Sequence, residues 1–179
     1  MDELDNKLVV LLKERKPGQE LEVRFRCTSQ HASKILKHLK SHSKWTHVQH
    51  KSHQDVISKS LRKRTDEDGT EHVTNKVMVD KADFVIHGSA LGSGISARAI
   101  LSNENKATWS NNQMITQIRF SERHTFVHQA YISFDITTSV STSADDYHKQ
   151  IPAQVSNEIE IELIAEKYKG NNAILLHAQ

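Results

Sequence analysis

The chain reads ELEVRF at residues 20–25 and EIEIEL at residues 158–163, so glutamates alternate with large apolar residues in both places. Successive side chains of a β-strand point to opposite faces. The glutamates of each stretch therefore share one face, and the apolar residues between them share the other. This pattern predicts two strands that each pack against a core on one side and carry carboxylates on the other.

Two rows of carboxylates cannot lie close together without compensation. Like charges repel strongly in a partly dehydrated site, so such rows must face bulk water, meet fixed cations or bind a metal ion. Any one such strand is more simply explained as an amphipathic strand with a solvated face. The two rows together, with basic residues at even spacing on the stretches between them, favour an enclosed and charged site. These basic residues are Arg62, Arg64, Lys76, Arg98, Arg119 and Arg123.

Length and charge restrict the classes of protein. A chain of 179 residues can form a domain with a real core, and we expect a single domain over residues 1–179. The formal charge is only +2, so overall electrostatics do not indicate a nucleic-acid binder or a membrane-surface protein. The lone Cys27 and the lack of a secretory signal favour an intracellular, reducing compartment. No apolar run is long enough to cross a bilayer.

Hydrophobic periodicity predicts few helices and many strands. Leucines at helical spacing indicate a helix before Pro17, and a second helix capped by Thr28 or Ser29 should end near residues 41–43. Strands are expected from residue 56 onward, with a hairpin turn at residues 66–70, a glycine-rich break at 88–94 and a loop at 139–150. The expected strands cover residues 56–65, 72–80, 82–87, 95–103, 114–126, 130–140 and 157–165.

This pattern of many strands and few helices predicts an α+β fold that is mainly β, with an antiparallel sheet that closes or nearly closes. A closed barrel can be packed by helices on its outside and can hold a hydrated, charged cavity inside. The carboxylates would then face the cations across that cavity.

The order of these motifs resembles the metal-dependent RNA 5′-triphosphatases of fungi, protozoa and large DNA viruses, in the triphosphate tunnel metalloenzyme superfamily. That family has a first strand with Glu-x-Glu and a last strand with Glu-x-Glu-x-Glu, similar to residues 20–22 and 158–162 here. Between them it has an Arg strand, a Lys strand, an Arg strand ending in Glu, a basic strand and a strand with Asp. The residues that match these strands are Arg62, Lys76, Arg98, Glu104, Arg119, Arg123 and Asp135, and Ser121 stands where the family has a lysine.

The resemblance covers most of the chain and implies a closed eight-stranded antiparallel tunnel with a few flanking helices. It implies an mRNA 5′-triphosphatase that removes the γ-phosphate of triphosphate-ended RNA in cap formation, hydrolyses NTPs as well, and needs Mg²⁺ or Mn²⁺. The implied partners are that RNA, NTPs and a fused or recruited guanylyltransferase, with no membrane. The expected location is the nucleus or the cytoplasm, or a cytoplasmic viral factory or virion if a virus encodes the chain.

The resemblance also implies roles for single residues. Metal binding falls to Glu20, Glu22 and Glu162, with Glu158 and Glu160 as further candidates, because hard divalent ions prefer oxygen ligands. The catalytic base would be Glu160 or Glu104. Phosphate binding and catalysis fall to Arg62, Lys76, Arg119 and Arg123, with Arg64 and Arg98 as further substrate contacts and Asp135 positioning one of the cations.

Two other functions remain open. A tripolyphosphatase or another organic triphosphatase of the same superfamily would keep the tunnel and change the substrate, although those siblings usually begin with Glu-x-Glu-x-Lys, and Arg24 stands at that place here. A non-catalytic module that binds polyphosphate or an RNA end is disfavoured, because a passive anion binder gains nothing from five carboxylates. We expect no zinc site at His47, His50 and His53, since a structural zinc site needs a fourth ligand.

Overall fold

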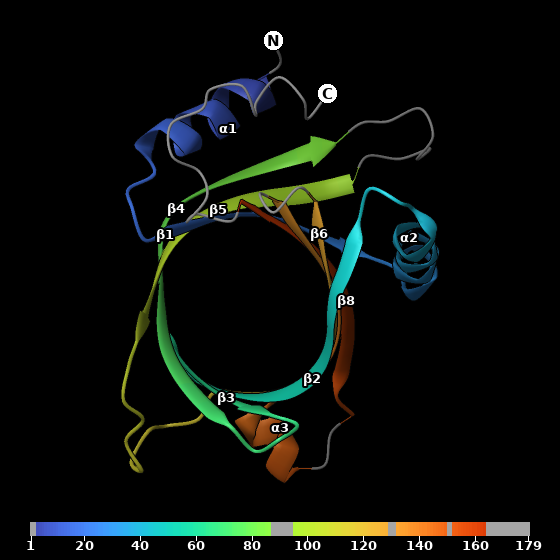
Figure 1. The fold of residues 1–179 in the computed structure, drawn as a ribbon. Helices are drawn as coiled ribbons and strands as arrows, with labels where there is room; N and C mark the ends of the chain where they lie inside the picture. The colour runs from blue at the N-terminus through green and yellow to red at the C-terminus, as the bar shows by residue number, and fades with distance from the viewer. Residues whose placement is uncertain (1–2, 87–94, 129–131, 150–151, 164–179) are drawn as a thin grey trace.

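The computed structural model describes residues 3–86, 95–128, 132–149 and 152–163, which form three helices and eight strands (Figure 1). The helices are α1 (Glu3–Glu14), α2 (Ser29–Ser41) and α3 (Ala144–His148). The strands are β1 (Gln19–Cys27), β2 (Thr46–Ser58), β3 (Leu61–Asp66), β4 (Glu71–Ile86), β5 (Ile95–Lys106), β6 (Gln117–His128), β7 (Ile132–Ser143) and β8 (Gln154–Leu163).

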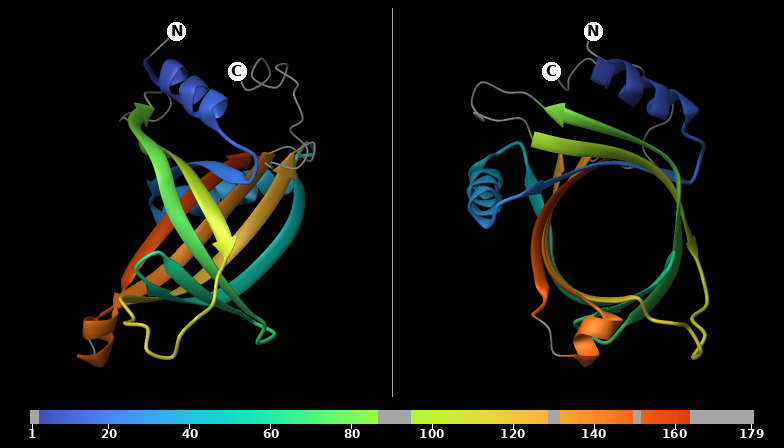
Figure 2. Two further views of the ribbon diagram at one scale, coloured as in Figure 1. Left: turned by 90° about the vertical axis from the view of Figure 1, so that its left-hand side faces the viewer. Right: turned by 180° about the vertical axis from the view of Figure 1, so that it is seen from behind.

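The eight strands close into one antiparallel barrel with the order β1-β5-β4-β3-β2-β6-β7-β8 (Figures 1 and 2). The predicted fold class, mainly β with a closed eight-stranded barrel and a few flanking helices, is confirmed. Closure pairs the first strand with the last one, so that Glu22 lies directly opposite Glu162. Residues that are distant in the sequence therefore become neighbours along one seam of the wall.

The hydrophobic core lies outside the barrel, between its wall and the helices. Apolar residues of the strands point outward, and α1 and α2 cover them on two sides (Figure 1). As predicted, Thr28 caps α2, because its side chain accepts a hydrogen bond from the backbone N–H of His31. The buried residues are Leu11, Leu21, Ala99 and Leu101 next to α1, and Ala32, Leu39, Phe126, Ile136 and Ile159 next to α2. This packing leaves the barrel interior to polar residues.

Several predicted strand boundaries are wrong. The stretch 56–65, predicted as one strand, contains the turn between β2 and β3, where Lys59 adopts a φ of 54°. The stretch 72–80 and the described part of the stretch 82–87 belong to one strand, β4, which has an irregularity between Met78 and Asp80 that hides its alternation. Residues 141–143, in the predicted loop 139–150, continue β7, because inward-facing serines and threonines need not be apolar, and residues 144–148 of that loop form α3. The predicted break at residues 88–94 lies outside the described residues.

The hairpin predicted at residues 66–70 joins β3 to β4 as expected. Gly69 has a φ of 82°, which an L-residue rarely adopts, and its N–H donates to the carbonyl of Asp66 (2.9 Å). The turn fixes the register in which β3 and β4 bring their basic residues to the interior.

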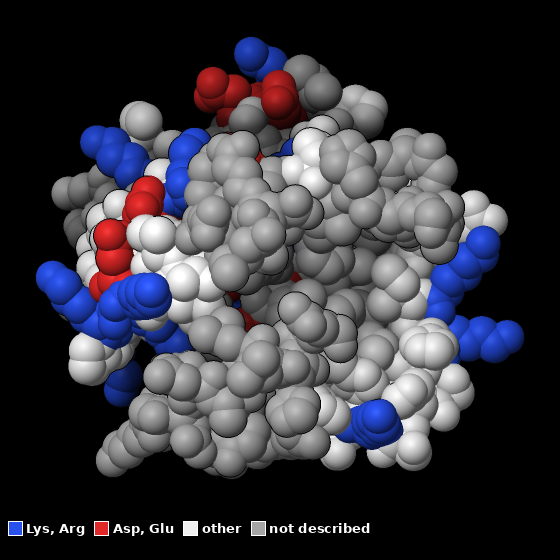
Figure 3. Space-filling view, turned by 90° about the horizontal axis from the view of Figure 1, so that it is seen from above, with Lys and Arg blue, Asp and Glu red and all other residues white. Residues whose placement is uncertain are grey.

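The face of the molecule seen from above carries mixed charge. Lys and Arg side chains lie on several sides of this face, with Asp and Glu side chains beside those at the top and left (Figure 3). No helix of the described part combines the length and the apolar character that crossing a membrane requires.

Candidate active site in the barrel interior

Glutamates of β1 and β8 line one side of the interior. Glu22 is only 5% exposed, and it faces Glu162 across the β1–β8 ladder, with Glu20 two positions away on the same strand face. Burial, followed by the negative charges of Glu20 and Glu22, raises the pKa of Glu162 to about 7. The three carboxylates predicted to bind metal are thus brought together in a place where negative charge is not fully compensated. We call these three residues the acidic wall.

Lys76 of β4 reaches the acidic wall across the interior. Its Nζ donates to Oε2 of Glu20 (2.9 Å) and lies 3.3 Å from Glu22 and 3.7 Å from Glu104. Burial alone would lower the pKa of Lys76, but the charges of Glu22 and Glu20 outweigh it and raise the pKa. Arg62 donates to Glu104, and with Lys76 it lowers the pKa of Glu104 against the opposing effect of burial. Lys76 and Arg62 therefore both contact carboxylates of the interior.

Glu160 of β8 is held by two arginines from opposite directions. Nε of Arg24 lies 2.9 Å and Nη2 of Arg123 lies 3.2 Å from its carboxylate. Burial alone would raise the pKa of Glu160, but these two charges lower it. Arg123 also donates to Oδ2 of Asp135 (3.2 Å), where burial raises the pKa of Asp135. Asp135 thus contacts one of the predicted cations, as the sequence-based role requires.

A basic wall faces the interior from β2, β3 and β6, and it consists of Arg64 and Arg119 around the fully buried Asp55. Arg64 Nε donates to Oδ1 of Asp55 (2.9 Å), and Arg119 donates to Oδ2. Burial alone would raise the pKa of Asp55, but the hydrogen bonds and charges of these arginines lower it to about 2. Next to this group, burial and the charge of Arg64 lower the pKa of His53 to about 4. The basic wall therefore carries its own counterion.

A cavity of about 480 Å³ lies inside the barrel. This volume is in the range of small-molecule sites. Its lining is rich in cations, and among the residues predicted for the site it includes Arg62, Arg64, Glu104, Arg123 and Asp135. Lys51, His53 and His72 also line it. The arrangement can hold a strongly anionic group among several positive charges.

Two predicted residues lie away from this cluster. Arg98 pairs with Asp83, and both side chains are half exposed. Glu158 lies 4.0 Å from Arg24 and shares with Arg98 a second cavity of about 360 Å³. Both residues stand nearer the end of β1, opposite Arg24 or Arg26 in the register. The structure does not bring Arg98 to the other predicted phosphate contacts.

Comparison with known proteins identifies solved structures that this chain resembles. No protein-family model and no curated relative matches the chain. The solved structure of the S. pombe Pct1 RNA triphosphatase matches it with a TM-score of 0.66 and 17% identity, covering 89% of this chain and 76% of that one. The Mimivirus capping enzyme triphosphatase matches with a TM-score of 0.63 and 14% identity, covering 99% and 94% of the two chains.

This chain has the triphosphate tunnel fold. The predicted resemblance to RNA triphosphatases is confirmed at the level of the fold, and the barrel interior described above is the tunnel. One matching Pct1 structure is a complex with the Spt5 CTD.

The acidic wall of the tunnel suits a divalent metal ion. Its donors are all carboxylate oxygens, which Mg²⁺ and Mn²⁺ prefer. Burial, and then repulsion by Glu20 and Glu22, raise the pKa of Glu162, and a bound cation would relieve that repulsion. In the side-chain positions of this structure Lys76 and Arg24 hold Glu20 and Glu22, so a metal would share these oxygens with them or move them. The residues present therefore fit the cofactor predicted from the sequence.

Arg24, Lys51, His53 and Asp55 are among the tunnel residues that the sequence-based prediction missed. Arg24 had a signal, because it shares even parity with Glu20 and Glu22 on one strand. The other three lie on the part of β2 that precedes residue 56, where no strand was predicted. Alternation of Lys51, His53 and Asp55 was the available signal, but the outward positions between them are polar and give no hydrophobic contrast.

Proposed function

We propose that this protein is a metal-dependent RNA 5′-triphosphatase that removes the γ-phosphate of triphosphate-ended RNA and also hydrolyses NTPs. The observation that carries the proposal is the acidic wall of Glu20, Glu22 and Glu162, which Lys76 contacts inside the barrel. The fold shared with two RNA triphosphatases supports the same chemistry.

Substrate binding falls to the cations around the cavity. Arg62 and Arg64 of β3 and Arg123 of β6 line it from two directions, and arginine can bind phosphate oxygens in fork geometry. Each of these arginines contacts a carboxylate in the structure, Glu104, Asp55 or Glu160 respectively. A triphosphate must compete with these carboxylates for the arginines, which limits how tightly the ground state is bound.

Metal binding falls to Glu20, Glu22 and Glu162, with Glu160 beside them and Glu158 more distant. A bound Mg²⁺ or Mn²⁺ would neutralise charge that develops on the phosphoryl oxygens. Lys76, which contacts both Glu20 and Glu22, would keep the two carboxylates oriented and present its remaining positive charge to the phosphate.

Glu104 is the better of the two candidates for the residue that orients the attacking water. Glu104 lines the cavity, whereas Glu160 is held between Arg24 and Arg123. Both have a lowered pKa, which makes either a weak proton acceptor near neutral pH. Phosphoryl transfer through a loose transition state depends mainly on positioning, so accepting a hydrogen bond from water is sufficient.

The proposed partners follow from the product. Removal of the γ-phosphate leaves diphosphate-ended RNA, the substrate for cap addition, so a fused or recruited guanylyltransferase is the expected next enzyme. The proposed location is the compartment where transcripts are capped, either nucleus or cytoplasm, or a viral factory or virion if the chain is viral.

Incubation with γ-labelled triphosphate RNA, tripolyphosphate and ATP, each with and without Mn²⁺ or Mg²⁺, tests the proposal. We expect metal-dependent release of γ-phosphate, with a higher kcat/KM for RNA than for tripolyphosphate. A preference for tripolyphosphate would identify the chain as an organic triphosphatase of the same fold. Tight binding of triphosphate without release would identify it as a binding module.

A further inference from the structure

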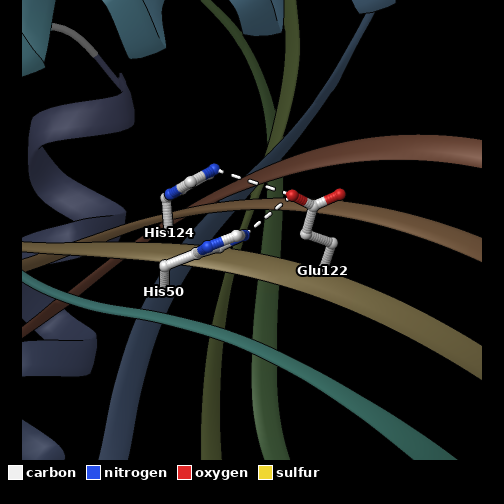
Figure 4. Close-up of side chains that lie close together, drawn as sticks. All are labelled: His50, Glu122 and His124. Atoms are coloured by element: carbon white, nitrogen blue, oxygen red, sulfur yellow. Dashed lines mark hydrogen bonds and ion pairs between the residues drawn. The ribbon is translucent and has the colours of Figure 1, made fainter.

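A second group of metal-binding side chains lies on the outer wall of the barrel, away from the tunnel. His50 of β2 and Glu122 and His124 of β6 point toward one another from two neighbouring strands (Figure 4). The ligand atoms of all three lie within 4.8 Å of one another. Among the described residues, this is the group of histidine, cysteine, aspartate and glutamate side chains whose ligand atoms come this close together.

The distances suit a single small cation. Nε2 of His50 lies 2.7 Å and Nε2 of His124 lies 3.9 Å from Oε1 of Glu122. Tetrahedral Zn²⁺ with bonds of about 2.0–2.2 Å separates its ligand atoms by roughly 3.4 Å, between these two values. The rings of His50 and His124 are stacked with their centroids 4.1 Å apart, and both Nε2 atoms approach the same carboxylate, so one ring would turn to point both lone pairs at a single ion.

His47 supplies the support that a metal-binding histidine usually has. Its Nε2 lies 3.4 Å from Nδ1 of His124, so it can accept a hydrogen bond from the nitrogen of His124 that does not face Glu122. A partner of this kind fixes the tautomer and leaves Nε2 of the ligand free for a metal. The β-bulge between His47 and Gln49 brings His47 to the outer face, which strict alternation would not have done.

We propose that His50, Glu122 and His124 bind a transition-metal dication, Zn²⁺ in the first place, at a site separate from the tunnel. Imidazole and carboxylate ligands suit Zn²⁺ better than Mg²⁺. The half-exposed His50 and Glu122 leave room for water or another ligand as the fourth donor. Two other charged groups affect positive charge at these histidines. Lys40 repels a cation near His124, and Glu67 attracts one near His50.

A bound ion would link β2 to β6 next to the irregularity in their pairing between His47 and Gln49. A ligand that binds only the folded state stabilises it. Zn²⁺ should therefore raise the melting temperature of the full chain. The inference does not depend on the proposed phosphatase activity, and each can fail without the other.

Isothermal titration of the full chain with ZnCl₂ in excess Mg²⁺ tests the site. We expect one tightly bound Zn²⁺ per chain. Its affinity should fall at least about 100-fold in His50→Ala and His124→Ala, and about 10-fold in His47→Ala. Co²⁺ in place of Zn²⁺ should give the visible absorption of a four-coordinate ion, and the same variants should lose it. Melting in EDTA verifies that each variant is folded.

Two matched controls separate this site from others. His38→Ala breaks an exposed pair with His42 at helical spacing, and Glu162→Gln alters the acidic wall of the tunnel. Both should keep wild-type Zn²⁺ affinity. Absence of stoichiometric Zn²⁺ binding in the wild type, unchanged affinity in His124→Ala, or loss of affinity in either control would overturn the proposal.

Discussion

The two walls of the tunnel carry buried carboxylates with opposite properties. Burial and the neighbouring glutamates raise the pKa of Glu162 on the acidic wall to about 7. On the basic wall, Arg64 and Arg119 outweigh burial and lower the pKa of Asp55 to about 2. The negative charge of a carboxylate is thus incompletely neutralised by nearby cations on the acidic wall and more than neutralised on the basic wall. The acidic wall is prepared to receive a cation, whereas the basic wall is already electrostatically complete.

The largest expected effect concerns the basic wall. Asp55→Asn removes the shared counterion of Arg64 and Arg119 and leaves two guanidinium groups facing each other. We expect the free energy of unfolding to fall by about 3 kcal/mol or more, measured from urea denaturation. Asp83→Asn, which removes the partner of Arg98 in an exposed pair, should leave the urea midpoint unchanged. Equal urea midpoints for Asp55→Asn and wild type would contradict the proposed difference between the two walls.

The next effect concerns catalysis by the acidic wall. Glu20→Ala and Glu162→Ala should each reduce metal-dependent release of γ-phosphate by on the order of 100-fold or more, because preorganised charge is lost where the metal would bind. Glu71→Ala is the matched control, since Glu71 is an exposed strand glutamate paired with Lys63. Near-normal activity of both tunnel variants would remove the acidic wall from the mechanism.

A smaller effect is the pH dependence of stability without metal. The folded pKa of Glu162 lies above its usual value, so the wild type loses stability as pH rises from about 4.5 to about 7. In EDTA, the free energy of unfolding of Glu162→Gln should therefore exceed that of the wild type by about 1–2 kcal/mol near pH 8. Near pH 4 it should not exceed that of the wild type. Added Mg²⁺ should stabilise wild type more than the variant. A constant difference across this pH range would show that Glu162 is not under-compensated.

Asp55 should behave in the opposite sense in the same denaturation series. Its folded pKa is lowered, so its contribution is complete above its usual pKa and is lost as pH falls through about 2. Subtracting the Asp55→Asn curve from the wild-type curve isolates this contribution.

The smallest effect concerns the second cavity. Arg98→Ala should change kcat/KM for γ-phosphate release by no more than about threefold, because the half-exposed pair with Asp83 is worth little and lies away from the main cavity. Arg123→Ala, which removes a contact to both Glu160 and Asp135, provides the comparison and should reduce kcat/KM more strongly. An Arg98 variant as impaired as the Arg123 variant would place substrate contacts in the second cavity too.

Much of the tunnel was predictable because two strands alternate so clearly. The parity of Glu20 with Glu22, and of Glu158 with Glu160 and Glu162, predicted an inward carboxylate face, and the apolar residues between them do face the helices. The predictions failed along β2 and at the end of β7. There both faces of a strand are polar, so hydrophobic contrast, the main signal of strand periodicity, is missing.

Pairing partners were a second limit. Asp55 is recognisable as a counterion only when β3 and β6 flank β2 and bring Arg64 and Arg119 to it. The outer histidine site depends likewise on two strands and on a bulge. The three-residue spacing of His47, His50 and His53 gave no sign of this site, because His53 points into the tunnel and two of the ligands lie on β6.

The amino-acid sequence by itself determined a mainly β architecture, the helices α1 and α2 that cover it and the inward orientation of the two glutamate rows, because alternation and capping are local properties of the chain. The tertiary structure decided which charges meet: Lys76 with Glu20, Arg24 with Glu160, and Asp55 with two arginines. Charge compensation depends on distances between strands, and only closure of the barrel sets those distances.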